Sequence, residues 1–515
     1  MSDTRNNLQR FDLCLSLSEM AINSQLAEAW RVWAKTRSRE RHVIVRHDET
    51  GSDIKLTARL DVPSLSLIAS PHDSGKVLVS LPIKNGEAII VATGEKTDLG
   101  SCSLSFLSTL ERKPVSLKEI SRLDPDIGED VGETVHNNPQ KDSTERHFAI
   151  QALYLNLIVS EHDFSDFRLL DALGRTFDSP HLDRIREVLL NALRGLGSGQ
   201  LLMGTIVYPK ENTKRATTLA PLDFRHNIRT NDIDHRGSSI DYFGVFEGSC
   251  EGRSIENEYQ ASATWLDIEK ITGNGVTAGI MAIKGRQFSK LIAQKIAYVL
   301  GVQAPVADGD GWLILSRSDN EVKRDGNIFQ YDLKRLSNQQ TLIRIFPVPT
   351  KNMLELSIHV AVAEQIWLTS KIASNFEGKW SKTAAAYLQI IMEDTFGVDE
   401  PSIKLRLSQR KPDFSISPLA YDEIEHSWTR DVDRKIGSAT GGSVEESCER
   451  AVENNIQWIT QALQTAFTGF SVSLDNFDFV PPGEQDFIFT TPRFSPELDL
   501  LFDVNFKSPV IRGQN

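Results

Sequence analysis

The sequence predicts an α+β protein in which long, strongly twisted antiparallel sheets wrap around long amphipathic helices. Two observations lead to this fold class. Apolar and polar residues alternate along unusually long runs, which is typical of strands with one buried and one solvated face. Amphipathic segments with helical spacing lie between these runs. A sheet with a continuous apolar face needs helices to cover it, so we expect each sheet to enclose one or two of them.

The chain opens with a predicted strand that runs straight into a predicted helix, FDLCLSLSEMAINSQLAEAW at 11–30. The odd positions of its first half are apolar and the even ones polar, which predicts a half-buried strand. Ser16 and Glu19 have the spacing of a capping box, with Ser18 as an alternative N-cap. Apolar residues then recur on one helical face, and basic residues near Lys35 suit the helix end.

Three later runs alternate in the same way, and the last is the longest. If it is one strand, it covers about fifteen residues, or roughly 50 Å, whereas average strands have about five or six residues. The runs lie at 54–62, 77–83 and 354–368.

Four further segments have the spacing of amphipathic helices. Gly195 and Gly301 are C-terminal stop signals for the first two. The last passes directly into an alternating strand at 470–479. The predicted helices are 181–195, 286–301, 380–396 and 445–468.

Composition narrows the class of protein. The chain has 515 residues with 40% hydrophobic content, enough for large cores, and a net charge of −13. This acidity argues against a general nucleic-acid binder. The four cysteines are too widely spaced for a zinc knuckle or a CxxC motif, and we interpret them as reduced cysteines of a cytosolic chain.

No targeting segment is expected. Residues 1–10 lack the apolar core of a signal peptide. The most apolar stretch, 353–368, carries Glu355, His359 and Glu364, so we expect that it does not cross a bilayer as a helix. We therefore expect a protein that is cytoplasmic as synthesised, and export without a cleaved signal stays open.

Polar stretches rich in turn formers predict the division into domains. We expect an N-terminal helix-in-curved-sheet unit at 1–240, with a linker at 110–146, and a C-terminal one at 241–515, with a linker at 429–444. A further linker is predicted at 208–240.

Motifs of catalysis and metal binding are missing from the sequence. There is no Walker A pattern, and the GLGSG stretch at 195–199 has Gln200 where a dinucleotide loop needs glycine. We predict no enzyme, no cofactor and no metal site. One enzyme alternative is an acid–base or metal site formed by His226 and His235 in the polar loop, although a solvated loop is the simpler interpretation.

Two basic clusters stand out in this acidic chain. One surrounds the end of the first helix, and from it we predict headgroup contacts by Lys35, Arg37, Arg39 and Arg41. The other comprises Lys284, Arg286, Lys290 and Lys295. Such clusters suit anionic lipid headgroups. The alternative is a solvated face whose charges compensate the helix dipole.

Three stretches carry a resemblance to a known family: FDLCLSLSEMAINSQLAEAW at 11–30, FAIQALYLNLIVSEHDF at 148–164, and the helix and strand between 181 and 209. This pattern resembles the TULIP (tubular lipid-binding) superfamily. It is most similar to the TULIP-type accessory proteins of orfX-type clostridial neurotoxin gene clusters. The resemblance implies a curved sheet wrapped around a helix, lipid or apolar-ligand binding, and an auxiliary role beside a toxin in a bacterium.

We therefore predict non-enzymatic binding of lipid or another apolar molecule in a tubular groove, with peripheral membrane contact. The alternative is a filled core in an interaction protein that joins products of neighbouring genes in a toxin-associated complex. The predicted lining consists of inward-facing strand and helix residues: Ile22, Leu26, Trp30, Trp33, Ile54, Leu56, Leu60, Leu354, Leu356, Ile358, Val360 and Val362.

Overall fold

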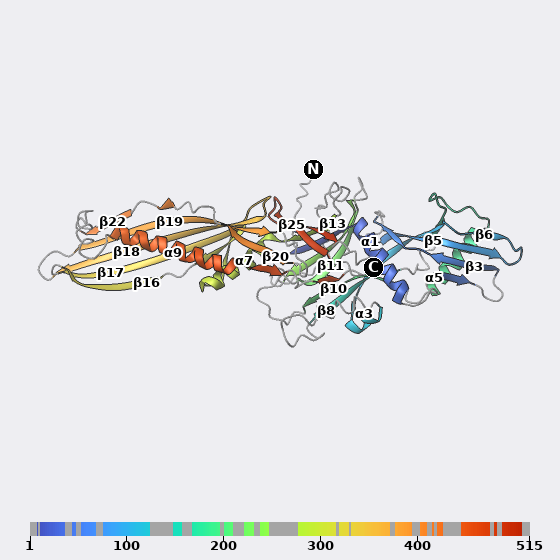
Figure 1. Cartoon of the computed structure of the whole chain (residues 1–515), viewed down its shortest axis with the longest axis horizontal. Coiled ribbons are helices and arrows are strands. Elements are labelled where there is room, and N and C mark those ends of the chain that lie inside the picture. Colours follow the sequence, from blue (N-terminus) through green and yellow to red (C-terminus); the bar gives the residue numbers. More distant parts are fainter. Residues whose placement is uncertain are drawn as a thin grey trace, which may run out of the picture. The chain divides into compact units, whose positions relative to one another are not determined.

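The fold is α+β, built from long antiparallel sheets and a few helices, as predicted (Figure 1). The computed structural model describes residue 8 and the ranges 11–36, 44–47, 53–67, 76–123, 148–156, 167–195, 200–209, 221–230, 237–246, 277–315, 319–328, 331–370, 376–393, 402–408, 415–416, 420–425, 444–473, 478–480 and 487–506. The long neighbouring strands of the described ranges, such as β17 with β18 and β18 with β19, pair antiparallel.

The chain divides into two compact units. The first unit contains Met1–Ile283 together with Leu474–Thr490 and Phe502–Asn515, and the second contains Lys284–Ser473 with Thr491–Leu501. The division therefore falls after residue 283, and two C-terminal pieces belong to the first unit. The boundary between two domains that we predicted at residue 240 stays a prediction, because compact units are not the same as independently folding domains.

A six-stranded sheet brings the first strand of the chain next to strands from far along the sequence. β1 pairs with β12 on one side and with β13 on the other. The strand order is β11 (Pro221–Arg229), β12 (Ser239–Phe246), β1 (Leu13–Ser18), β13 (Thr277–Ile283), β26 (Leu500–Phe506) and β25 (Phe487–Phe494).

The first unit also contains a ten-stranded sheet. Its main path is β2 (Ile44–His47), β3 (Ile54–Leu60), β5 (Lys76–Ile90), β7 (Ser103–Val115), β8 (Phe148–Asn156), β10 (Gln200–Pro209) and β24 (Asp478–Val480). Beside this path, β4 (Ser64–Ser66) and β6 (Lys96–Asp98) pair with β5, and β9 (Arg168–Leu170) pairs with β7.

The second unit holds another ten-stranded sheet, with the longest strands of the described chain. Its main path is β14 (Val306–Asp308), β15 (Gly311–Leu315), β17 (Tyr331–Pro347), β18 (Met353–Ser370), β19 (Phe376–Glu393), β20 (Ser402–Ser408) and β23 (Ser471–Ser473). In addition, β16 (Asp319–Ile328) pairs with β17, whereas β21 (Ser415–Ile416) and β22 (Ala420–Glu425) pair with β19.

Helices cover the sheets. Within the first unit, α1 packs on strands of both sheets, and α5 packs on β2, β3 and β9. In the second unit, α9 runs along β18, β19 and β20, while α7 contacts β15, β17 and α9 (Figure 1). Their bounds are α1 (Glu19–Thr36), α3 (Leu117–Leu123), α5 (Leu182–Gly195), α7 (Gly285–Leu300) and α9 (Val444–Phe467).

The opening strand is buried on both faces, so the prediction of a half-buried strand was wrong. Both parities of β1 are buried, and β1 is an interior strand of its sheet, between β12 and β13. The N-cap of α1 is Ser18, whose Oγ accepts a hydrogen bond from the Ala21 amide at 3.2 Å. The alternative prediction, Ser18 as the N-cap, was therefore correct, because Ser16 lies inside the strand and Ser18 is its last residue.

The helix predicted at 380–396 is instead the long strand β19. Alanine-rich sequence favours helix locally, but the same residues also alternate, and every second side chain from Ala384 to Met392 is buried. β19 pairs with β18 from Phe376 to Ile391. This continuous pairing outweighs the helical propensity, which is a weak local preference.

Two predicted linkers contain regular structure. The segment 110–146 begins inside β7 and continues into α3, and its residues beyond 123 lie outside the described residues. The segment 208–240 includes the end of β10, all of β11 and the start of β12. Within the described residues, polar composition was misleading because these strands carry many polar side chains, and the linker expected over 124–146 stays a prediction. The linker at 429–444 lies outside the described residues except for Val444, the first residue of α9.

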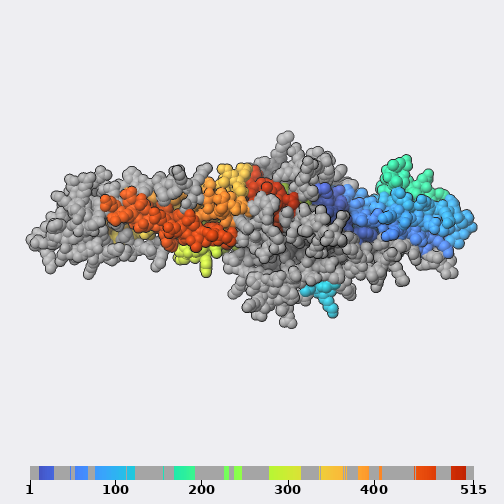
Figure 2. Space-filling model, in the orientation of Figure 1, coloured from blue at the N-terminus to red at the C-terminus, as the bar shows by residue number. Residues whose placement is uncertain are grey.

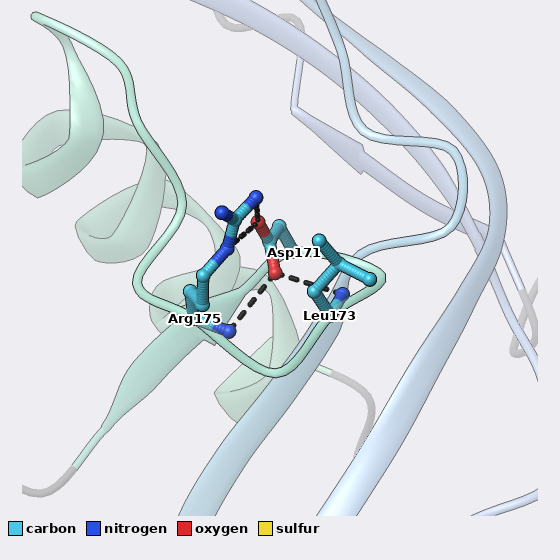
Figure 3. Close-up of polar contacts among 3 residues, drawn as sticks. All are labelled: Asp171, Leu173 and Arg175. Atoms are coloured by element: carbon cyan, nitrogen blue, oxygen red, sulfur yellow. Dashed lines mark hydrogen bonds and ion pairs between the residues drawn. The ribbon is translucent and has the colours of Figure 1, made fainter.

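A tight turn connects β9 to the segment before α5, and one carboxylate organises it (Figure 3). Asp171 Oδ1 accepts hydrogen bonds from the amides of Leu173 at 2.8 Å and Arg175 at 2.9 Å. Its Oδ2 accepts from the Arg175 guanidinium, with Nη2 at 2.8 Å. The Arg175 amide first, and then its side chain, lower the pKa of Asp171. The turn presents Leu173 at its tip, 74% exposed.

The alternation of β19 predicts that substitutions at two adjacent alanines differ in their effect on the free energy of unfolding. Ala386 is buried beneath α9, so Ala386→Leu is expected to lower the free energy of unfolding by about 1–3 kcal/mol through overpacking. Ala385 has the other parity, and Ala385→Leu is expected to change it by less than about 0.5 kcal/mol. Urea denaturation of both variants measures this. Equal losses would contradict a strand at this position.

Asp171 makes the turn depend on pH. Because the folded pKa is lowered, the stabilisation is present above the unfolded pKa of about 4 and is lost as pH falls through the folded value. Asp171→Asn is expected to reduce amide protection of Leu173 and Arg175 at neutral pH. Hydrogen exchange of a peptide covering the turn, corrected for intrinsic rates, measures this, with Asp178→Asn as control. Unchanged protection in Asp171→Asn would refute this role of the carboxylate.

Candidate functional site

The predicted lining on β18 forms one apolar surface with its two neighbours. Leu354, Leu356, Ile358, Val360 and Val362 are all buried. Register joins them into cross-strand rows, such as Ile343–Ile358–Ala386 and Ile345–Leu356–Leu388. Since side chains of one parity share a face, this alternation creates a continuous apolar face across β17, β18 and β19.

The helix α9 packs on β18 and β19 of this surface, while α7 contacts β17. The buried side chains of α9 recur three or four residues apart, on one side of the helix: Cys448, Val452, Ile456, Ile459, Leu463 and Phe467. Two polar contacts fix the helix on the sheet, from Asn455 Nδ2 to Thr341 Oγ1 at 3.1 Å and between Lys382 Nζ and Glu449 Oε1 at 3.3 Å. The opposite side of α9 forms part of the surface in Figure 2 and carries the exposed Trp458.

In the first unit, the predicted lining belongs to two different helix-covered surfaces. Ile22, Leu26 and Trp30 are buried on α1, which packs against β1, β4, β10, β12 and β13. The strand residues Ile54, Leu56 and Leu60 are buried on β3, which is covered by α5. Trp33 lies within α1, and its side chain is outside what the structure describes.

One buried amide on α1 was not predicted from the sequence. Gln25 is only 2% exposed, and its Nε2 has no hydrogen-bond partner. Gln25 lies on α1 between Ile22 and Leu26, which are also buried. By contrast, both ends of the nearby Asn23 amide are hydrogen-bonded. Its Nδ2 donates to the Leu65 carbonyl at 2.9 Å, and its Oδ1 accepts from the Leu65 amide at 2.6 Å. An unpaired buried amide lowers the stability of the folded protein, because its donor has lost its hydrogen bonds to water.

A second unpredicted feature is a buried polar cluster in the six-stranded sheet. The guanidinium of Arg229 pairs with the Asp241 carboxylate, which also accepts a hydrogen bond from Ser239 Oγ at 2.7 Å. Cys14 lies near it, with Sγ 3.5 Å from Ser16 Oγ. Burial raises the pKa of the Cys14 thiol well above its ordinary value, and the charge of Asp241 adds to this rise. Such a satisfied network is suited to fixing strand register.

The alternative enzyme site was expected in a polar loop, and the structure describes one of its two histidines. His226 lies in the strand β11, where it pairs in register with Tyr242, so it is not in a loop. Its proposed partner, His235, lies outside the described residues, as do Arg37, Arg39 and Arg41. Lys35 belongs to α1, but the structure does not describe its side chain.

No helix among the described residues is both long enough and apolar enough to span a membrane. The stretch 353–368, which contains the most apolar run of the sequence, lies within the strand β18.

Comparison with known proteins identifies structural relatives but no sequence relatives. The chain matches no protein-family model and no curated protein sequence. Its fold is similar to that of P47 from Clostridium botulinum A2, with a TM-score of 0.52 at 12% identity, covering 97% of this chain and 98% of the other. P47 of Clostridium botulinum E1 gives 0.49 at 8% identity, with 96% and 99% covered. A lipopolysaccharide binding protein gives 0.29 at 8% identity, with 96% and 99% covered. The likeness to the A2 protein concerns the fold alone.

The environment of Cys14 predicts a hidden thiol. At about pH 8.5, where an ordinary thiol is half ionised, Cys14 is expected to stay protonated and unmodified by iodoacetamide in the folded protein. The same residue should react readily in denaturant, and mass spectrometry of the peptide at 11–30 distinguishes the two. Equal labelling rates in both states would contradict the buried cluster.

Proposed function

We propose that the protein binds a lipid or another apolar molecule without catalysing a reaction, as a TULIP-type protein. Its partner in this function is an acyl chain or a molecule of similar shape. The ligand lies between an amphipathic helix and the apolar face of a long sheet. Whole-length similarity of fold to P47 of Clostridium botulinum A2 supports this family, as does the resemblance of the sequence to TULIP proteins.

The observation that carries the proposal is the unpaired Gln25 amide on the apolar side of α1. A core filled only by protein gains stability when a buried, unpaired amide is replaced by an apolar group. A ligand-binding interior uses such a donor to orient the polar end of an otherwise apolar molecule. Gln25 is buried together with Ile22 and Leu26, which provide the apolar part of such a site.

A second candidate function is an interaction protein with filled cores. The observation that favours it is the close cover of β18, β19 and β20 by α9, which leaves the predicted lining residues of β18 buried against protein. In this case, the protein assembles with products of neighbouring genes, in the accessory role beside a toxin that the sequence resemblance implies. Pull-down with those products, before and after delipidation, separates this function from lipid binding.

An enzyme that uses His226 is the weakest candidate. His226 lies in a paired strand, opposite Tyr242, and not in the polar loop where this site was expected. We therefore expect His226→Ala to alter neither turnover of any substrate nor metal content. A change in either would refute the non-enzymatic proposal.

Gln25 provides the sharpest test of lipid binding. We expect Gln25→Leu to reduce the amount of lipid that copurifies with the protein about tenfold, because one buried hydrogen bond to the ligand is lost. The delipidated variant should be more stable than the delipidated parent by about 1–3 kcal/mol, because an unpaired buried amide is gone. Native mass spectrometry with solvent extraction measures lipid, and urea denaturation measures stability.

The control is Gln461→Leu, which changes the same side chain at an exposed position on α9. It should change neither the copurified lipid nor the free energy of unfolding substantially. If the parent protein carries no lipid and takes none from vesicles, lipid binding is refuted and the filled-core function stands. If Gln25→Leu keeps the full lipid content, Gln25 is not the polar contact.

A further inference from the structure

The helix α7 presents a basic surface that the interior site does not use. We call it the α7 basic face and define it by Arg286, Lys290, Lys295 and Tyr298, all at least partly exposed. The chain has no Asp or Glu between residues 271 and 307, although its net charge is −13. The positive charge of this segment is therefore a local reversal of the protein's overall charge.

The order of these residues produces a defined geometry. At about 100° per residue, Arg286 and Lys290 lie on one flank of the solvent-facing side and Lys295 lies on the other. Tyr298 lies between the flanks and is 83% exposed. The apolar side of the helix, with Phe288, Ile292 and Ile296, is buried in the second unit.

Compensation of the helix dipole does not account for these charges. Arg286 lies in the first turn of α7, at the positive end of the dipole, where a cation is unfavourable. The first turn contains no acidic residue, the N-cap makes no side-chain hydrogen bond, and the last turn contains no basic residue. The charges thus oppose the pattern that stabilises a helix, which points to a role outside folding.

Aromatic rings hold the cations in place without neutralising them. The Arg286 guanidinium and the Lys290 ammonium lie 5.7 Å and 5.5 Å from the centre of the Trp312 ring. The indole Nε1 of Trp312 donates to the Arg286 carbonyl at 3.0 Å, which fixes the ring. Lys295 lies 5.1 Å from the centre of the Phe470 ring.

No carboxylate among the described residues pairs with these three cations. The nearest acidic position along the chain, Asp308, is bound instead by Arg344 at 2.9 Å. Cation–π contacts leave the positive charge available to an external anion. The α7 basic face therefore offers three positioned charges to a partner with spread negative charge.

We propose that the α7 basic face docks on a bilayer that contains anionic phospholipid. Because the apolar side of α7 is buried in the second unit, the docking is by charge: clustered Lys and Arg side chains attract the anionic headgroups at a bilayer surface. Tyr and Trp favour this region, where an apolar ring meets water. This inference rests on the proposed function and extends it. It names the surface that brings the protein to a membrane, where lipid is available.

The test compares vesicle binding of the full chain and a triple variant, Arg286→Gln with Lys290→Gln and Lys295→Gln. Vesicles of phosphatidylcholine with phosphatidylserine, and of phosphatidylcholine alone, are used in sedimentation assays. Three lost cations are expected to weaken binding to the anionic vesicles about a hundredfold. Binding of the parent should also fall as salt rises.

The charge-matched control is Lys96→Gln with Arg184→Gln and Arg406→Gln. These cations pair with Glu87, Asp53 and Glu393. The control should bind vesicles like the parent. A swap that keeps the charges, Arg286→Lys with Lys290→Arg and Lys295→Arg, should also retain binding. If the triple variant fails to fold, Tyr298→Ala is the second test, with an expected loss of several-fold.

Three results would overturn the proposal: equal loss in the charge-matched control, equal binding of the parent to neutral vesicles, or retention on polyglutamate without binding to vesicles. The last would identify an acidic protein as partner. Lipid content from solvent extraction separates this proposal from the interior site. Vesicle binding that persists in a protein without internal lipid supports docking and refutes only the interior site.

Discussion

The apolar face of the long sheet in the second unit depends mainly on the helix α9 to keep it from water, with α7 packed beside it on β15 and β17. Strands of this length place many large side chains on one face, and each fully buried Leu or Ile contributes about 1.5–3 kcal/mol. The helix α9 spans about 36 Å, more than half of the roughly 59 Å of β18, and its buried apolar residues recur along its length. Small residues such as Ala384 and Ala386 let the helix approach. The unit is thus organised by the contact between one helix and one sheet face.

The sequence-based predictions succeeded where one periodicity was unambiguous. Alternation from Leu354 to Val362 specified a strand and its buried face, and helical spacing specified α9. The segment at 380–396 satisfied both periodicities, and only pairing with β18 decided between them. Gln25 and the pair of Arg229 with Asp241 were out of reach, because their significance depends on burial and on neighbours far away in the sequence.

The interior site and the α7 basic face are proposed to recognise two different parts of a lipid. An interior site recognises the apolar chain, through helix-covered sheet faces on which few polar groups occur. The α7 basic face recognises surface charge, through cations that aromatic rings position but do not neutralise. These two forms of recognition use separate residues, so either can persist when the other is lost. Their combination is suited to a protein that collects its ligand from a membrane.

The two C-terminal returns of the chain have a consequence for biosynthesis. β26 joins the sheet beside β13, and β24 pairs with β10, so the first unit lacks β24, β26 and the first half of β25 until residues 478–506 have emerged. The sequence of the second unit, Lys284–Ser473, is inserted between these parts. During translation, one edge of β10 and one edge of β13 stay unpaired while the inserted residues are synthesised. Unpaired strand edges promote aggregation. The order of synthesis therefore makes the first unit, although it contains the N-terminus, the last to be completed.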